Sequence, residues 1–508
     1  MEQQMVLERS TEVAEEAQQV TREKMSGAVS KREFTTAETV ISILCFVLGF
    51  VFTHFVAGYA GGLWGGIFWM LTGVLGAVYV KVRKIFTTRL HGIVFGVAEL
   101  FCLTPLFCTN VFINTLAAWF SFLLFGYLCI SLSKGELFGE HFITDLAEAI
   151  CVQPFTRFTD GPEAVKKLFK NPRAGKTMFY VFCGVLLSIP LSMVVLILLI
   201  SSDAMFADWI NKVWEYLPEF EFSYVVEFGL AFLVWMYVYG AFSASGVKRT
   251  ERLFDLKKFR ALPAVLGYTT VTPICVFYVL YIAVQFNYFT AAFGGSLPSE
   301  YSYSSYARQG FFELCIIAII NLAVIVFMQT FVERKEDRTS SRLLRCYSTV
   351  VAGMTLLLIA SALSKMVLYI SEMGMTPLRI YTSWFMLVLA VLFVLIIVAQ
   401  FTKLPFWKAA FAGFSVLFAM LCFSNVDGMI ADYNVTAYEE DRLESVDFDV
   451  LESLGDAALV HVERLTEASD ERIAERATDC YEDMMKKSGW KDDFAYFSIP
   501  RAIGRSGK

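Results

Sequence analysis

Three ionisable side chains lie inside apolar stretches of this sequence that are long enough to cross a bilayer. Lys365 lies in SALSKMVLYI, with Ser361 and Tyr369 four residues to either side, Glu227 lies in SYVVEFGLAF, and Glu313 lies in FFELCIIAII. A charge at the bilayer centre costs roughly 2.5–3.5 kcal/mol on insertion scales, so such a residue is expected to be paired or functional. Their opposite signs and similar distances from the ends of their stretches predict that Lys365 pairs with Glu313 or Glu227.

Further polar residues fall at the same ends of these stretches. Asp203 lies in SSDAMF, Arg308 in YSSYARQGFFEL and Arg379 in GMTPLRIYTSWF. We expect them to join Lys365 in one polar network, although ordinary interfacial residues within a belt of Tyr and Trp would have the same sequence pattern. Glu99 differs because it lies near the middle of its stretch, too deep to reach the interface. It is either protonated or paired, and the sequence leaves both open.

The sequence lacks the usual signatures of catalysis and metal binding. GxSxG, HExxH and GxxxxGK[ST] do not occur, and the eleven cysteines include no CxxC pair. The four histidines are scattered along the chain, at His54, His91, His141 and His461. We therefore predict no catalytic, cofactor-binding or metal-binding residue, and we expect His54 to form a hydrogen bond between helices.

The composition is that of a polytopic membrane protein. Hydrophobic residues make up 56% of the 508 residues and charged residues 18%, with a mean hydropathy of +0.55. Because lipid offers no hydrogen bonds to the backbone, each apolar stretch must be a helix. We predict an all-α bundle of about eleven spans, near residues 39–59, 63–80, 90–109, 112–132, 177–200, 223–245, 264–288, 311–331, 346–370, 380–401 and 408–424.

The positive charges predict how this bundle is oriented. Loops after even-numbered spans carry 24 Lys and Arg residues, whereas those after odd-numbered spans carry only Lys212, Arg308 and Arg379. Cytoplasmic loops are the ones enriched in Lys and Arg. Residues 1–38 are thus expected to be a polar cytoplasmic segment, and residues 425–508, after the bundle of 39–424, to be extracytoplasmic.

Two further segments have helical spacing of apolar residues. In the tail, VDFDVLESLGDAALVHVERL and SDERIAERATDCYEDMMKK predict a small helical hairpin, whose single cysteine, Cys480, excludes an internal disulfide. In the loop 133–176, DLAEAI and EAVKKLFK predict short interfacial helices, with a solvated loop as the alternative.

Four stretches together resemble a known family. They are SSDAMF, then VQFNYF with YSSYARQGFFEL, then SALSKMVLYISEMGMTPLRIYTSWFM, and last NVDGMIADYNV. In order and spacing they are similar to a family of bacterial membrane proteins catalogued as a domain of unknown function, in two closely similar versions numbered 4153 and 4173. The likeness covers about residues 180–435, with Gln309 and Ala204 departing from the family pattern. The resemblance implies a bacterial inner-membrane protein and no particular activity.

Three classes of function are compatible with these residues. The first is transport or permeation of a small solute or ion through a cavity at Lys365 that opens to the outside. The second is a scaffold or sensor that binds another envelope protein, and the third is an intramembrane enzyme acting on a lipid-linked substrate through Asp203, Glu227 or Glu313. The lipid bilayer is the expected partner in every case. The net charge is −6, and the charged residues are unevenly distributed along the chain, so the charge indicates no nucleic-acid partner.

Overall fold

The computed structural model describes residues 34–56, 62–139, 141–166, 222–248, 262–293, 311–332 and 338–489, with single residues in 184–210 and 498–502. Within these residues the secondary structure is helical throughout, apart from one isolated β-bridge between Leu262 and Val332. The predicted all-α fold is therefore confirmed.

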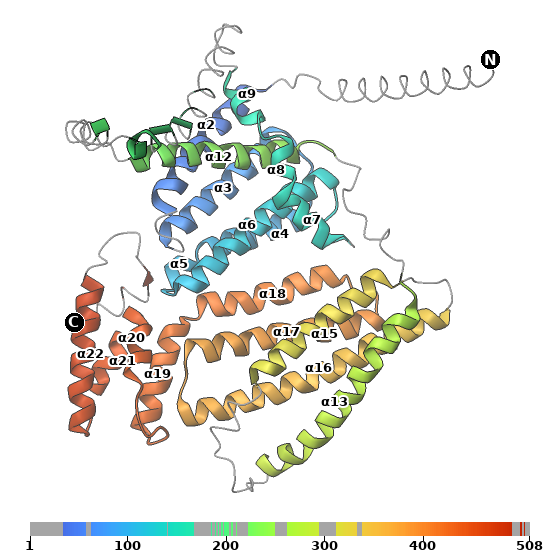
Figure 1. Ribbon diagram of the computed structural model, residues 1–508, viewed down its shortest axis with the longest axis vertical. Coiled ribbons are helices and arrows are strands. Elements are labelled where there is room, and N and C mark those ends of the chain that lie inside the picture. The colour runs from blue at the N-terminus through green and yellow to red at the C-terminus, as the bar shows by residue number, and fades with distance from the viewer. Residues whose placement is uncertain are drawn as a thin grey trace. The chain divides into compact units, whose positions relative to one another are not determined.

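The described residues in the first half of the chain form a series of helices, shown from blue to green in Figure 1. They are α2 (Thr36–Val51), the π-helix η1 (Phe52–Val56), α3 (Leu63–Val82), α4 (Arg89–Cys102), α5 (Thr104–Phe107), α6 (Val111–Lys134), α7 (Phe142–Cys151), α8 (Gln153–Thr156), α9 (Asp160–Lys166) and α12 (Phe222–Ser245).

The second half continues in the same way, from yellow-green to red in Figure 1. Its helices are α13 (Ala264–Phe293), α15 (Phe311–Phe331), α16 (Arg338–Met373), α17 (Pro377–Phe401), α18 (Phe406–Phe423), α19 (Val426–Glu439), α20 (Phe448–Ser453), the 3-10 helix η3 (Gly455–Ala458), α21 (Leu459–Leu465) and α22 (Glu471–Gly489).

Nine candidate membrane spans are found among the described residues by length and hydropathy. They are Thr36–Val56, Leu63–Val82, Val111–Lys134, Tyr224–Ser245, Gly267–Val284, Phe311–Phe331, Arg342–Met373, Pro377–Phe401 and Phe406–Phe423. Each matches a span predicted from the sequence. Of the other two predicted spans, 177–200 falls mostly outside the described residues, and 90–109 is not one continuous helix. The count of eleven therefore stays a prediction.

The predicted span at 90–109 is interrupted at Leu103. The 14-residue helix α4 ends before this residue, and the four-residue helix α5 starts after it. Pro105 lies in the first turn of α5, where its missing N–H is tolerated and where it also disfavours a continuous α-helix through the preceding residues. A helix of 14 residues is about 21 Å long, which is shorter than the hydrocarbon core of a bilayer.

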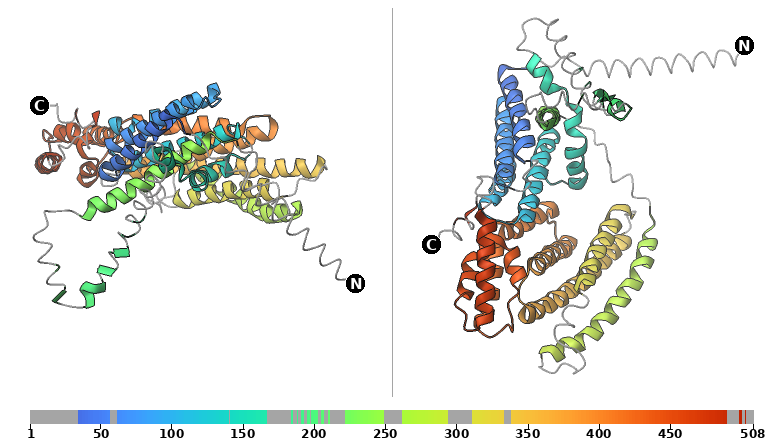
Figure 2. Two further views of the ribbon diagram at one scale, coloured as in Figure 1. Left: turned by 90° about the horizontal axis from the view of Figure 1, so that it is seen from above. Right: turned by 60° about the vertical axis from the view of Figure 1, so that its left-hand side comes forward.

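One apolar core holds α13, α15, α16 and α17 together. Helices α15, α16 and α17 lie side by side, and α13 packs along α16 (Figures 1 and 2). Phe311, Ile325, Leu358 and Phe393 are buried in this core. Since lipid tails are as apolar as these side chains, the helices associate through close packing and a few polar contacts.

A second core joins the tail to the membrane-spanning helices. It contains Phe101 of α4, Ile113 of α6 and Phe418 of α18, together with Ile430 of α19 and Leu451 of α20. The first half of the predicted tail hairpin is divided into α20, η3 and α21, and its second half is α22. Residues 425–489 thus share their hydrophobic core with helices that cross the membrane.

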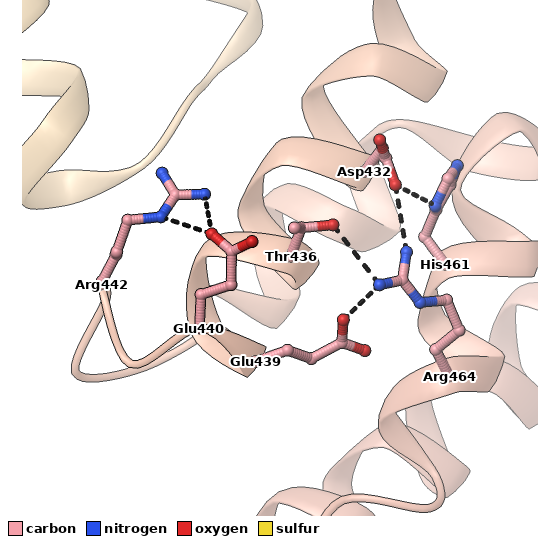
Figure 3. Close-up of polar contacts among 7 residues, drawn as sticks. All are labelled: Asp432, Thr436, Glu439, Glu440, Arg442, His461 and Arg464. Atoms are coloured by element: carbon pink, nitrogen blue, oxygen red, sulfur yellow. Dashed lines mark hydrogen bonds and ion pairs between the residues drawn. The ribbon is translucent and has the colours of Figure 1, made fainter.

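Polar contacts also connect α19 with α21 in the tail (Figure 3). Arg464 donates hydrogen bonds to Asp432 Oδ1 at 3.0 Å and to Thr436 Oγ1 at 3.4 Å, and it forms an ion pair with Glu439. The Nδ1 atom of His461 lies 3.4 Å from the same oxygen of Asp432. These charges hold α21 against α19 at the surface of the second core.

A buried ion cluster attaches α7 to the end of α6. Lys134 Nζ lies 2.7 Å from Asp145 Oδ1 and 2.7 Å from Glu148 Oε2, and all three side chains are less than one-tenth exposed. The predicted helix at DLAEAI is therefore present, and it packs against α6 through this cluster. Buried charges must be paired in this way, because an isolated one would cost several kcal/mol.

The chain divides into two units, residues 1–44 with 159–219 and residues 45–158 with 220–508. In the first unit, the Thr35 backbone N–H donates to Glu38 Oε2 at 2.7 Å, which caps the start of α2. Ser42 Oγ donates to the carbonyl of Gly161 at 2.9 Å and connects α2 with α9. The helices of both cores described above belong to the second unit.

Candidate functional site

Lys365 is buried inside the bundle of α13, α15, α16 and α17. Its side chain belongs to α16 and is 6% exposed, and its neighbours Ala362 and Met366 are part of the apolar core. Glu313, in the first turn of α15, is close enough to attract the Lys365 ammonium electrostatically. Lys365 therefore points into protein rather than along the lipid surface. A direct contact of Nζ with a carboxylate oxygen stays a prediction.

Glu227 has a different partner from the one expected. Its Oε2 atom lies 3.0 Å from Nδ1 of His54, which connects α12 with η1. His54 thus forms the contact between helices that its position in a span predicts. The sequence predicts that Lys365 pairs with either Glu313 or Glu227. Because Glu227 contacts His54, Glu313 is the favoured partner of Lys365.

Arg379 holds the turn between α16 and α17. Its Nη1 atom donates to the carbonyls of Met373, at 2.9 Å, and of Gly374, and its guanidinium lies 4.1 Å from the ring centroid of Tyr369. Gly374 has φ of +77°, a conformation in which glycine ends helices without strain. The specific partners expected for Arg379 are thus carbonyls at the end of α16 and an aromatic ring one turn beyond Lys365.

Of the remaining predicted site residues, only Glu99 is among the described residues. Arg308 and Asp203 lie outside the described residues. Glu99 projects from α4 onto α3, where a Cβ added at Gly73 would collide with its Oε1 atom. Within the described part of the chain this buried Oε1 has no hydrogen-bond partner. The glycine therefore makes the space that Glu99 occupies.

A series of hydrogen bonds connects polar side chains inside the bundle. The sequence does not show which of these side chains are partners. Tyr278 Oη donates to Asn321 Oδ1 at 2.7 Å, Asn321 Nδ2 donates to Thr355 Oγ1 at 2.8 Å, and Thr355 Oγ1 donates to the Val351 carbonyl at 2.6 Å. Asn321 and Thr355 are 1% and 0% exposed. These hydrogen bonds join α13, α15 and α16. An amide within the run IIAIINLAVIV is a visible signal, but its partners are not.

Polar side chains extend from Thr355 to Lys365 and beyond along one face of α16. Thr355, Ser361, Lys365 and Tyr369 fall within about a third of the helix circumference, at 100° per residue. Ser361 is 8% exposed, and its Oγ has no hydrogen-bond partner among the described residues. We call these four residues the α16 polar face. It covers 15 residues, or about 21 Å along the helix axis.

A helical bundle with nine described helices able to cross a bilayer and buried polar groups between them defines an integral membrane protein. The sequence model of a family described as Domain of unknown function (DUF4153) matches residues 95–465, well over half of the chain. The protein belongs to this family, which confirms the resemblance noted in its motifs. No curated protein and no solved structure matches the chain.

Proposed function

We propose that the protein transports a small solute or ion across the bacterial inner membrane, with a binding site at Lys365. The observation that carries this proposal is the burial of Lys365, a cation that is 6% exposed within a membrane-spanning helix. A charged side chain in such a position is costly, so its retention favours a role in a substrate or ion pathway.

The chemistry of lysine limits what such a site binds. An ammonium group has three donors and no acceptor, so its ligand must offer hydrogen-bond acceptors, and an anionic oxygen is the acceptor that it binds most strongly. Glu313 attracts the Lys365 ammonium. A solute carrying a negative charge would compete with this carboxylate, and release of the solute would restore the attraction.

The α16 polar face provides a route from Lys365 toward the middle of the membrane. Ser361 and Thr355 follow Lys365 along this face, and Asn321 and Tyr278 contribute further polar groups at the level of Thr355. Polar groups between helices can also serve only to hold the bundle together. A transport role differs from that alternative because it requires water to reach these side chains.

Labelling of single cysteines tests this requirement. In a background whose eleven native cysteines are replaced by alanine, Ser361→Cys and Thr355→Cys are treated from outside the cell with a membrane-impermeant methanethiosulfonate. Leu357→Cys is the control on the same helix, because Leu357 is 54% exposed on the lipid side. Thiols react as thiolates, which form in water and not in lipid.

We expect the two polar-face cysteines to be labelled and the control to stay unlabelled. If Ser361→Cys and Thr355→Cys react as slowly as Leu357→Cys, the bundle is solid and the transport proposal fails. That result would favour the scaffold or sensor role that the sequence also allows.

A further inference from the structure

Helices α2 and α12 cross in backbone contact at Gly49. A Cβ added to Gly49 would overlap the carbonyl oxygen of Ala231, so only glycine fits at this crossing. His54 lies five residues after Gly49, and Glu227 lies four residues before Ala231. Each is therefore about 6–8 Å along its helix from the crossing point.

The π-helix η1 turns His54 toward α12. In a regular α-helix, five residues at 100° each would leave His54 about 140° away from the face of Gly49. The wider turn of η1, with its i→i+5 hydrogen bonds, brings the fifth residue back toward that face. Thr53 Oγ1 donates to the carbonyls of Gly49, at 3.2 Å, and Phe50, at 3.1 Å, and so supports the widened turn. π-helical turns of this kind are rare and occur frequently at functional sites.

The resulting pair is short and partly open. His54 Nδ1 lies 3.0 Å from Glu227 Oε2, and the two side chains are 39% and 22% exposed. Phe50 and Tyr224 stack against the imidazole, and Phe55 meets it edge-on. The open imidazole is therefore framed by aromatic rings and has a carboxylate at one nitrogen.

The described helices around the pair contain few other charges. η1 packs against α3 and α12. Glu227 is the only charged residue of α12, which also carries Tyr224, Tyr237 and Tyr239, and α3 carries only Lys81 and Tyr79, both near its far end. Among the described residues of η1, α12 and the near end of α3, the pair therefore carries the charge.

We propose that His54 and Glu227 form a proton-binding site at this end of the span. Without the extra proton, a neutral imidazole donates its Nδ1–H to the carboxylate, and the pair carries one negative charge. A proton taken from water forms a new N–H bond at Nε2, and the resulting imidazolium and carboxylate are neutral together. Because a net charge is costly near the hydrocarbon, the uncharged state of the pair is the less costly of the two at this position.

This inference goes beyond the transport proposal, because proton binding by the pair does not require that a solute crosses the membrane. It is tested by ¹⁵N-histidine NMR of the full-length protein in nanodiscs. His54→Asn identifies the signals of His54 among the four histidines. The shifts of Nδ1 and Nε2 then report the fraction of imidazolium at pH 7.

We expect this fraction to fall several-fold in Glu227→Gln, which keeps the shape of the side chain but removes its charge. Glu372→Gln is the matched control, since Glu372 is an exposed carboxylate at the end of α16, and it should leave the fraction unchanged. An equal fraction in Glu227→Gln and the wild type would overturn the proposal. So would a His54 ring that stays neutral in the wild type from pH 8 to pH 5. Failure of the cysteine labelling at Ser361 and Thr355 would leave this result unaffected, so the two proposals fail separately.

Discussion

Asn434 forms two hydrogen bonds with the backbone of Met375. Its Oδ1 accepts from the Met375 N–H at 2.6 Å, and its Nδ2 donates to the Met375 carbonyl at 2.8 Å. The amide thus pairs with both backbone groups of one residue in the turn between α16 and α17. This contact anchors the tail helix α19 to the same turn that Arg379 stabilises.

Replacing this amide should destabilise the protein. Asn434→Ala leaves the N–H and the carbonyl of Met375 without their partner, which costs about 1–3 kcal/mol for a buried group. Thermal unfolding of the detergent-solubilised protein by scanning fluorimetry should show a lower midpoint. The exposed Glu444→Ala serves as the control. Equal midpoints for the two variants would mean that the contact contributes nothing to stability.

Truncating the tail should be more harmful than its sequence indicates. A small tail hairpin that folds separately, as the sequence predicts, would leave a chain ending at Asp432 inserted in the membrane. In the structure, however, Leu451 and Leu459 of the tail are buried in one core with Phe418 and Ile430. We expect the truncated protein to reach the membrane but to accumulate to a several-fold lower level, measured by immunoblot of membrane fractions. A chain ending at Gly489, which keeps α19 to α22, should accumulate normally. Equal levels of the two truncated proteins would show that the tail folds independently.

The attraction between Lys365 and Glu313 can be measured with a double mutant. Lys365→Met should lower the thermal midpoint, because Glu313 loses the cation that attracts it. Adding Glu313→Gln should recover part of that loss, since removing one charge of a coupled pair is worse than removing both. If the two effects simply add, the residues are not coupled, and Lys365 acts without Glu313.

His461 should make the stability of the tail depend on pH. Burial lowers the pKa of His461 below its ordinary value, with Asp432 opposing and Arg464 reinforcing the shift. The folded state therefore prefers the neutral ring, and stability is lost as the pH falls from about 6.5 toward the lower folded value. Between pH 7.5 and 5.5 the wild type should lose more stability than His461→Gln, as measured by urea unfolding of the detergent-solubilised protein. A constant difference between the two proteins across this range would contradict the prediction.

The orientation proposed from the distribution of Lys and Arg is open to a direct test. A reporter that is active only in the cytoplasm, fused after Lys508, should be silent, whereas the same reporter fused before Met1 should be active. Activity of the C-terminal fusion would mean that the number of spans is even, and the segments around Leu103 and at 177–200 would be the first to reconsider.

Much of the architecture could be predicted because membrane insertion depends on local composition. Each of the nine described spans coincides with an apolar stretch long enough to cross the hydrocarbon, and such a stretch must be helical wherever it lies in the chain. The interruption at Leu103 was missed, although Pro105 marks it. Hydropathy averaged over a stretch of about 20 residues is not sensitive to a single residue, such as a proline, that interrupts a helix.

Pairing within the site could be predicted only in part. The sequence singles out Lys365, Glu227 and Glu313, because a charge in an apolar run is conspicuous. It does not connect Glu227 with His54, which is 173 residues away, or Asn321 with Thr355 and Tyr278. A helix that is apolar on all sides has no periodic pattern to show which face is buried.

Hydropathy and the order of motifs are properties of the linear chain, so they are enough to identify a helical membrane protein of a recognisable family. The burial of Lys365, the turn of η1 that brings His54 toward Glu227, and the core that the tail shares with α6 and α18 are visible only in the folded protein. These relationships depend on which helix faces are apposed. Packing between segments far apart in the chain sets that apposition, and local composition does not encode it.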